Sequence, residues 1–160
     1  MKYSFIILGL PRAGTHMLAS ALDSHPEIAC RLKDNQVVYA PYTGRAWTRL
    51  EEIPYAEKYI VIHRPFVERM RSFRYTGYSH SYRPGIRPEE PCRARADFPD
   101  QDEELIEVAY QIKALQVHYS DLTGGLDCRQ IPQGWSQIIC DYLGVKRHIL
   151  CPRTYKPSTP

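Results

Sequence analysis

The fold is decided by one stretch of the chain, Phe5-Ile6-Ile7-Leu8-Gly9-Leu10-Pro11-Arg12-Ala13-Gly14-Thr15-His16-Met17-Leu18. Its first four residues form a short apolar run, typical of a parallel strand that is covered on both faces. Its end predicts a helix, because Met17, Leu18 and Leu22 share one face at helical spacing. A tight turn of small residues between a strand and a helix is an anion site, since backbone N–H groups and the helix dipole point out of the helix start. The stretch therefore predicts phosphate binding, and a strand–turn–helix without a ligand is the alternative.

The residues of the turn narrow the kind of phosphate. Gly9 and Gly14 have the spacing of the loop G-x-x-x-x-G-K-[ST], but Thr15 stands in place of its Lys and His16 in place of its Ser or Thr. That Lys binds the β- and γ-phosphates and the hydroxyl binds magnesium. The sequence therefore argues against hydrolysis of ATP or GTP and against a magnesium nucleotide. A cation stands earlier in the turn, at Arg12.

Composition sets outer limits on the function. The 160 residues are 43% hydrophobic and 24% charged, which predicts one compact domain over residues 1–160. A net charge of +3 suits an anionic ligand and falls short of a nucleic-acid binder, so no nucleic-acid partner is expected. The five cysteines form no C-x-x-C pair and predict reduced thiols without a metal site. The opening apolar run is too short for a signal peptide or a membrane span, so we expect a cytoplasmic protein without membrane contact.

The other elements follow from apolar runs, helical spacing, and glycine and proline signals. In chain order they are an open segment at 28–42 with a short strand at 36–39 as one alternative, a short helix or turn at 48–57, a strand at 59–62, a helix at 66–73, a long loop or lid at 75–99, a helix at 102–116, a strand at 116–119, a helix at 135–143 capped by Gly144, and a last short strand at 145–150.

This alternation of strands and helices predicts the α/β class, with a parallel sheet flanked by helices on both faces. Ligands of such sheets lie at the carboxyl ends of the strands. The turn that holds Arg12 and the turn that holds Arg64 both follow strands, so we expect them to lie near one another.

Four segments together resemble the PAPS-dependent sulfotransferase family, whose members use 3′-phosphoadenosine-5′-phosphosulfate (PAPS). Leu10 to Thr15, followed by His25-Pro26, is similar to the first signature of that family, P-[RK]-[SA]-G-T-T. Ile62 to Phe73 is similar to the second, R-x-P-x-x-R-x-x-S, and Arg64 and Ser72 have its spacing of eight residues. Residues 117–122 and 139–145 are similar to two later blocks of the family. The four blocks occur in family order and span nearly the whole chain.

The resemblance implies a P-loop NTPase-like sulfotransferase fold and a set of roles. The first signature would hold the 5′-phosphosulfate through Arg12 and the residues Ala13, Gly14, Thr15, His16 and Met17. Arg64 and Ser72 would hold the 3′-phosphate, and the tail cations Arg153 and Lys156 would close over it. Arg12 would stabilise the charge on the departing phosphate, and no metal is implied. The acceptor, of unknown identity, would carry a hydroxyl or an amine.

The general base stays open. Asp34 lies near the place where some relatives have a catalytic Glu, and His16 titrates near neutral pH; His63, His80 and His118 are lesser candidates. The family's second loop Thr is His16 here, and its later Glu is Ser120. A family member that binds PAPS or its product but has lost transfer is therefore an alternative, which the short chain also favours. A small phosphate-loop kinase is a third, weaker alternative.

Overall fold

The computed structural model describes residues 3–31, 42–76, 100–123 and 130–152. Their elements are, in chain order, β1 (Tyr3–Leu8), α1 (Thr15–Asp23), β2 (Ile28–Arg31), β3 (Tyr42–Trp47), β4 (Ala56–His63), α2 (Phe66–Thr76), α5 (Asp102–Gln111), β5 (Leu115–His118), α6 (Tyr119–Thr123) and α7 (Gln133–Leu143).

The strands form one sheet in the order β2-β3-β1-β4-β5, and every neighbouring pair is parallel. The strand β1 lies in the middle, with Ile7 beside Ala46 of β3 on one side and Ile60 of β4 on the other. Its apolar run is fully buried, as a central parallel strand requires. The predicted α/β class, with a parallel sheet between helices, is therefore confirmed.

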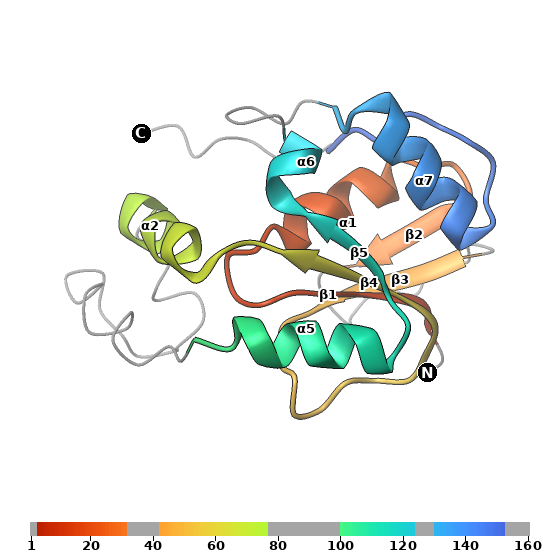
Figure 1. Ribbon diagram of the computed structural model, residues 1–160. Helices are drawn as coiled ribbons and strands as arrows, with labels where there is room; N and C mark the ends of the chain where they lie inside the picture. Colours follow the sequence, from red (N-terminus) through yellow and green to blue (C-terminus); the bar gives the residue numbers. More distant parts are fainter. Residues whose placement is uncertain (1–2, 32–41, 77–99, 124–129, 153–160) are drawn as a thin grey trace.

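Two cores lie on opposite faces of this sheet, and both are continuous with β1 and β4. Ile7, Ile60 and Leu18 belong to the core shared with α1 and α7, called here the α1-side core. Ile6 and Leu105 belong to the core under α5, called here the α5-side core. Figure 1 shows α1 and α7 on one face of the sheet, α5 on the other, and α2 extending outward beyond the end of β4. Alternate residues of β1 thus serve different cores.

The strand β3 was not predicted, and β2 fell in the segment left open. A glycine and an arginine interrupt the apolar pattern of β3, so its sequence gives a weak strand signal. The glycine has a packing reason, because a Cβ at Gly44 would overlap the ring of Phe5 on the neighbouring strand. The alternative strand at 36–39 lies outside the described residues.

The connection from β3 to β4 is a turn, so the helix alternative for 48–57 is wrong. The strand β4 begins at Ala56, three residues before its predicted start, and α2 continues three residues beyond its predicted end at Phe73. Both differences are extensions of elements whose centres the sequence located. The prediction of a loop from residue 75 is wrong for Tyr75 and Thr76, and the rest of that segment, 77–99, lies outside the described residues.

The helix predicted over 102–116 ends earlier, at Gln111, and β5 occupies the residues that follow. Lys113 adopts a left-handed backbone, with φ 54°. The Lys113 N–H donates to Tyr110 O and the Ala114 N–H donates to Ala109 O, which is the pattern of a Schellman cap. A lysine rather than a glycine holds this position, so the sequence carries no stop signal there. Gly144, with φ 76°, ends α7 as predicted.

The short strand predicted over 145–150 is absent from the structure, whose description covers that whole segment. Backbone groups there are bound outside the sheet: His25 Nε2 donates to Lys146 O at 2.7 Å, and Leu150 N donates to Ser136 Oγ at 3.2 Å. No helix among the described residues is long enough to cross a bilayer, since the longest, α2 and α7, have 11 residues where about 20 are needed.

Candidate functional site

The turn between β1 and α1 is held in one shape by the backbone and by Tyr119. Gly9 N donates to Trp47 O at 3.1 Å, and Ala13 N donates to Leu10 O at 3.0 Å. Gly14 has φ 102°, and a Cβ added to it would lie 2.7 Å from Cδ2 of Tyr119. Only glycine meets both conditions without strain. The ring of Tyr119, at the start of α6, therefore closes one side of the turn.

The start of α1 offers backbone donors rather than side chains. Gly14 is the N-cap residue and makes no side-chain capping hydrogen bond. Ala13 and Thr15 are buried, with 1% and 5% of their surfaces exposed, so their side chains face the core. The N–H groups of Thr15, His16 and Met17 lie in the first turn, where an α-helix supplies no partner for them. Such a helix start favours an anion.

His16 is the side chain of this helix start that reaches solvent. Partial desolvation and, second, the positive charge of Arg12 lower the pKa of its imidazole. The ring therefore favours the neutral form at neutral pH.

Arg12 joins the turn to α2. Its backbone is left-handed, with φ 68°. Its Nε donates to Ser72 Oγ at 2.9 Å, across 60 residues of sequence. Two residues that the sequence analysis selected from separate segments are thus in direct contact.

Arg64 follows β4 and lies against the same turn. Its Nη1 donates to the carbonyl oxygen of Arg12 at 3.0 Å, and its guanidinium lies 4.0 Å from the ring centre of Tyr119. Its Nε is buried and makes no hydrogen bond to a described residue, although it forms an ion pair with Glu68 Oε2 at 3.7 Å. A buried N–H without an acceptor is costly, and an anionic ligand would supply one.

An ion pair between Arg69 and Asp102 holds the turn, β4 and α2 in this arrangement. Arg69 of α2 is 1% exposed, and its Nη2 lies 2.8 Å from Asp102 Oδ1 at the start of α5. The same guanidinium donates to Pro11 O at 3.3 Å and to Arg64 O at 3.1 Å. Asp102 Oδ2 in turn accepts the Phe66 N–H at 2.9 Å, at the first residue of α2. We call Arg69 and Asp102 the arginine clasp, because they connect the turn, β4, α2 and α5.

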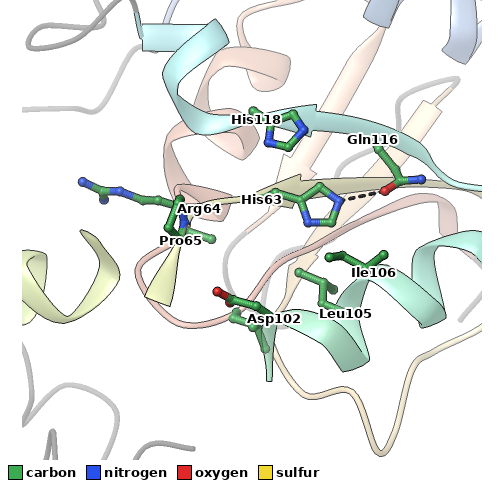
Figure 2. A pocket seen from close by; sticks show the side chains of 10 residues that line it. His63, Arg64, Pro65, Asp102, Leu105, Ile106, Gln116 and His118 are labelled. Atoms are coloured by element: carbon green, nitrogen blue, oxygen red, sulfur yellow. Dashed lines mark hydrogen bonds between the residues drawn. The ribbon is translucent and has the colours of Figure 1, made fainter. Parts of the chain in front are cut away.

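A pocket of about 380 Å³ opens beside the turn, on the face of the sheet that α5 covers. Figure 2 shows the ring of His63 in its middle, with His118 on one side, Leu105 and Ile106 on the other, and Gln116 within hydrogen-bond distance. The lining residues are Leu10, Ala13, His63, Arg64, Pro65, Asp102, Leu105, Ile106, Gln116 and His118.

The protonation of His63 follows from its contacts. Its Nε2 lies 2.9 Å from Gln116 Oε1, and because a carbonyl oxygen only accepts, Nε2 carries the hydrogen and Nδ1 the lone pair. The rings of His63 and His118 are 5.2 Å apart. Burial is the largest effect and lowers the pKa of His63; the hydrogen bond to Gln116 raises it, the neighbouring His118 lowers it, and Asp102, the smallest effect, raises it.

Four residues that the sequence analysis selected, Asp34, His80, Arg153 and Lys156, lie outside the described residues. The others gather at the carboxyl end of β1 and β4. Within the described parts of the chain, His, Cys, Asp and Glu form no group of three that could hold a metal ion, and the three cysteines there, Cys30, Cys140 and Cys151, are free thiols.

Sequence reasoning missed the roles of Arg69, Asp102 and Gln116. Arg69 stands between exposed helix residues and reads as a solvated side chain. The acidic start of α5 was attributed to the helix dipole, yet Asp102 lies against α2. One signal could have found Arg69, since it is the arginine at the sixth position of the R-x-P-x-x-R-x-x-S segment. That pattern does not indicate a partner 33 residues away.

Comparison with known proteins bears on the fold. No model of a known protein family matches the chain, and no curated protein sequence shows a significant match. Among solved structures, a sulfotransferase from Alicyclobacillus acidocaldarius is similar over 100% of this chain and 87% of its own, with a TM-score of 0.61 and 14% identity. The chain therefore has the P-loop-like α/β fold of a sulfotransferase, as the sequence predicted.

Proposed function

We propose that this protein is a sulfotransferase that moves a sulfuryl group from PAPS to an acceptor hydroxyl or amine. The observation that carries the proposal is the contact of Arg12 with Ser72 and of Arg64 with the Arg12 carbonyl. It joins two cationic segments at the start of a helix, with backbone donors between them. A fold shared with a sulfotransferase supports the same reading.

The residues present fit a doubly phosphorylated adenosine. The N–H groups of Thr15, His16 and Met17 suit a phosphosulfate, and the Nε of Arg64, which makes no hydrogen bond to a described residue, suits a second phosphate. Ser72 would add a hydroxyl on that side, and Arg153 and Lys156 are proposed to close over it. Bound PAPS supplies an activated sulfuryl group, and its departure leaves negative charge on a phosphate oxygen. Arg12 would stabilise that charge without giving up a proton.

Two features bear on the alternative functions, a binding-only protein and a kinase. His16 and Asp34 are the sequence-selected candidates for the base, and the structure describes only His16, whose pKa is lowered by burial and, second, by the charge of Arg12. Without an effective base the protein would bind the nucleotide and not transfer the group. A kinase is disfavoured, because Thr15 stands at the lysine position of the loop and is buried.

Calorimetric titration with 3′-phosphoadenosine-5′-phosphate (PAP) tests the nucleotide part of the proposal. We expect binding that needs no magnesium, at least tenfold tighter than that of adenosine 5′-phosphate. Ser72→Ala should weaken it about tenfold, since a hydrogen bond to a charged group contributes about 1.5–3 kcal/mol. Arg71→Ala, at the exposed neighbouring position, is the matched control and should bind normally. Failure to bind PAP, or displacement of PAP by magnesium ATP, would contradict the proposal.

Turnover of labelled PAPS with an acceptor panel then separates the enzyme from a binding protein. Transfer supports the full proposal. Normal PAP binding without transfer to any acceptor would instead support the binding-only alternative.

A further inference from the structure

The pocket around His63 shares a wall with the phosphate-binding turn. Leu10 and Ala13, which stand on either side of Pro11 and Arg12, line the pocket, and so does Arg64. A molecule held there would lie next to Arg12, the residue proposed to face the departing phosphate. Of the proposed nucleotide contacts, Ala13 and Arg64 line the pocket, whereas Ser72 and the first residues of α1 do not.

The charges of the pocket favour an uncharged occupant. The lining contains a permanent cation, Arg64, and a carboxylate, Asp102, and each already has a counterion. Asp102 lies 2.8 Å from Arg69, and Arg64 Nε lies 3.7 Å from Glu68 Oε2. A charged occupant would therefore find no unpaired opposite charge among the lining residues that the structure describes. The rest of the lining consists of apolar side chains and of the polar side chains of His63, His118 and Gln116. At about 380 Å³, the pocket lies near the lower end of the range of small-molecule sites, about 300–1,000 Å³, and so suits a compact molecule.

His63 presents a hydrogen-bond acceptor to this occupant. Its Nε2 hydrogen is committed to Gln116, which fixes the orientation of the ring. Its Nδ1 carries the lone pair and lies on the side of the ring turned away from Gln116, as Figure 2 shows. A neutral imidazole nitrogen accepts the hydrogen of an O–H group.

We propose that this pocket holds the acceptor, that the acceptor is an uncharged hydroxyl compound with a compact apolar body, and that His63 Nδ1 takes its proton. This inference rests on the proposed function. In the step, the acceptor oxygen forms a bond to sulfur as the bond from sulfur to the bridging phosphate oxygen breaks. The electron pair leaves with the phosphate, and the hydroxyl proton passes to Nδ1.

The surroundings of His63 suit this role better than those of His16. Burial is the main effect that lowers the pKa of both rings, but at His63 the hydrogen bond to Gln116 and, as the smallest effect, the charge of Asp102 on α5 act in the opposite direction and favour the imidazolium that forms. Arg12 has the opposite effect on His16. The charged and titratable groups that face His63 are His118 from β5, Asp102 from α5 and Arg64 from the adjoining turn.

Binding is tested with three probes of one shape: benzyl alcohol, benzylamine as a cation, and benzoate as an anion. The readout is the imidazole NMR spectrum of the histidine-labelled protein, with PAP present. We expect benzyl alcohol to shift the His63 and His118 signals and to bind at least fivefold more tightly than either charged probe. Equal binding of all three probes, or no shift at these two histidines, would overturn the assignment of the pocket.

The role of His63 is tested by transfer to benzyl alcohol. His63→Gln should lower kcat about 100-fold or more, the usual share of a general base, with PAP affinity unchanged within twofold. Added imidazole should restore part of the rate to His63→Ala, and the wild-type rate should fall at acidic pH. His148→Gln, an exposed histidine outside the pocket, is the control.

The outcomes separate the two proposals. A kcat of His63→Gln within threefold of wild type, or no rescue by imidazole, would overturn the role of His63 while leaving the nucleotide site intact. No transfer to benzyl alcohol by a wild-type protein that binds both PAP and this probe would also overturn it. Failure to bind PAP would overturn the proposed function, and the probe titration, repeated without PAP, would still decide what the pocket holds.

Discussion

Arg12 holds a backbone conformation that an arginine rarely adopts. A left-handed φ of 68° costs about 1–2 kcal/mol for a residue with a side chain. The hydrogen bonds from Arg12 to Ser72 and from Arg64 to the Arg12 carbonyl compensate for it. The strained residue is also the one proposed to act on the departing phosphate, and such strain is common at functional sites.

The two histidines with lowered pKa values make stability depend on pH. The unfolded chain takes up protons at His16 and His63 near pH 6.5, while the native protein resists this until lower pH. Stability attributable to these groups is therefore lost as the pH falls through about 6.5. We expect the double substitution of His16 and His63 by Gln to reduce the fall in urea midpoint between about pH 7.5 and about pH 5.5.

A double variant with the wild-type slope would show that these two histidines do not resist protonation in the native state.

At the residue scale, the sequence identified Arg12, Arg64 and Ser72 because each lies in a short local segment and is of a type that binds phosphate. It did not identify the arginine clasp, because its two members are far apart and each has an ordinary reading alone. A long-range contact leaves no periodic trace in the sequence.

The arginine clasp connects the turn, β4, α2 and α5, so its loss should lower the free energy of unfolding. Asp102→Asn keeps an acceptor for the Phe66 N–H but leaves the buried Arg69 charge without its counterion. Breaking a fully buried pair costs about 3–5 kcal/mol. The Asp102 side chain is 34% exposed, so we expect a smaller loss of about 2 kcal/mol in the free energy of unfolding, measured by urea denaturation.

An exposed pair of equal length provides the comparison. Arg147 and Asp141 also lie 2.8 Å apart, with both side chains more than half exposed. Asp141→Asn should leave the urea midpoint unchanged within error. Equal effects of the two substitutions would mean that burial does not strengthen the clasp.

Elements with a continuous apolar run, such as the centres of β1 and β4, were predictable because burial on both faces demands such residues. The strand β3 was not predictable, because its Gly44 makes room for the ring of Phe5 and glycine does not favour a strand. The end of α5 was also hidden, because Lys113 takes the place where glycine usually marks the stop.

The whole molecule has two cores that share one sheet, and this predicts cooperative unfolding. Ile6 and Ile7 are both fully buried neighbours on β1, but they face the α5-side and α1-side cores respectively. Either Ile→Ala substitution should cost about 2–5 kcal/mol. Trp47 packs against the α5-side core and Trp135 against the α1-side core. The fluorescence of variants that keep only one of these tryptophans therefore reports the unfolding of one face of the sheet.

Both probes should show one coincident urea transition in each variant, shifted to lower urea. A shift of the Trp47 transition in Ile6→Ala with the Trp135 transition unmoved would mean that the two faces unfold separately.

The class of the molecule was predictable from the alternation of strands and helices, and so was the meeting of the two cationic turns. The number of strands and their order were not, because they depend on edge strands whose side chains only have to fit their neighbours. The pocket was likewise invisible, since its walls come from β4, β5, α5 and the turn.

The arginine clasp also limits how the pocket can change over evolutionary time. Ile106 is 54% exposed, so its replacement would alter the pocket wall at little cost to folding. Asp102 stands one helical turn away on the same helix, and it cannot vary without loosening the support of Pro11 and Arg64. New specificities would therefore arise at the Ile106 end of this wall, while the Asp102 end is constrained by its support of the turn between β1 and α1.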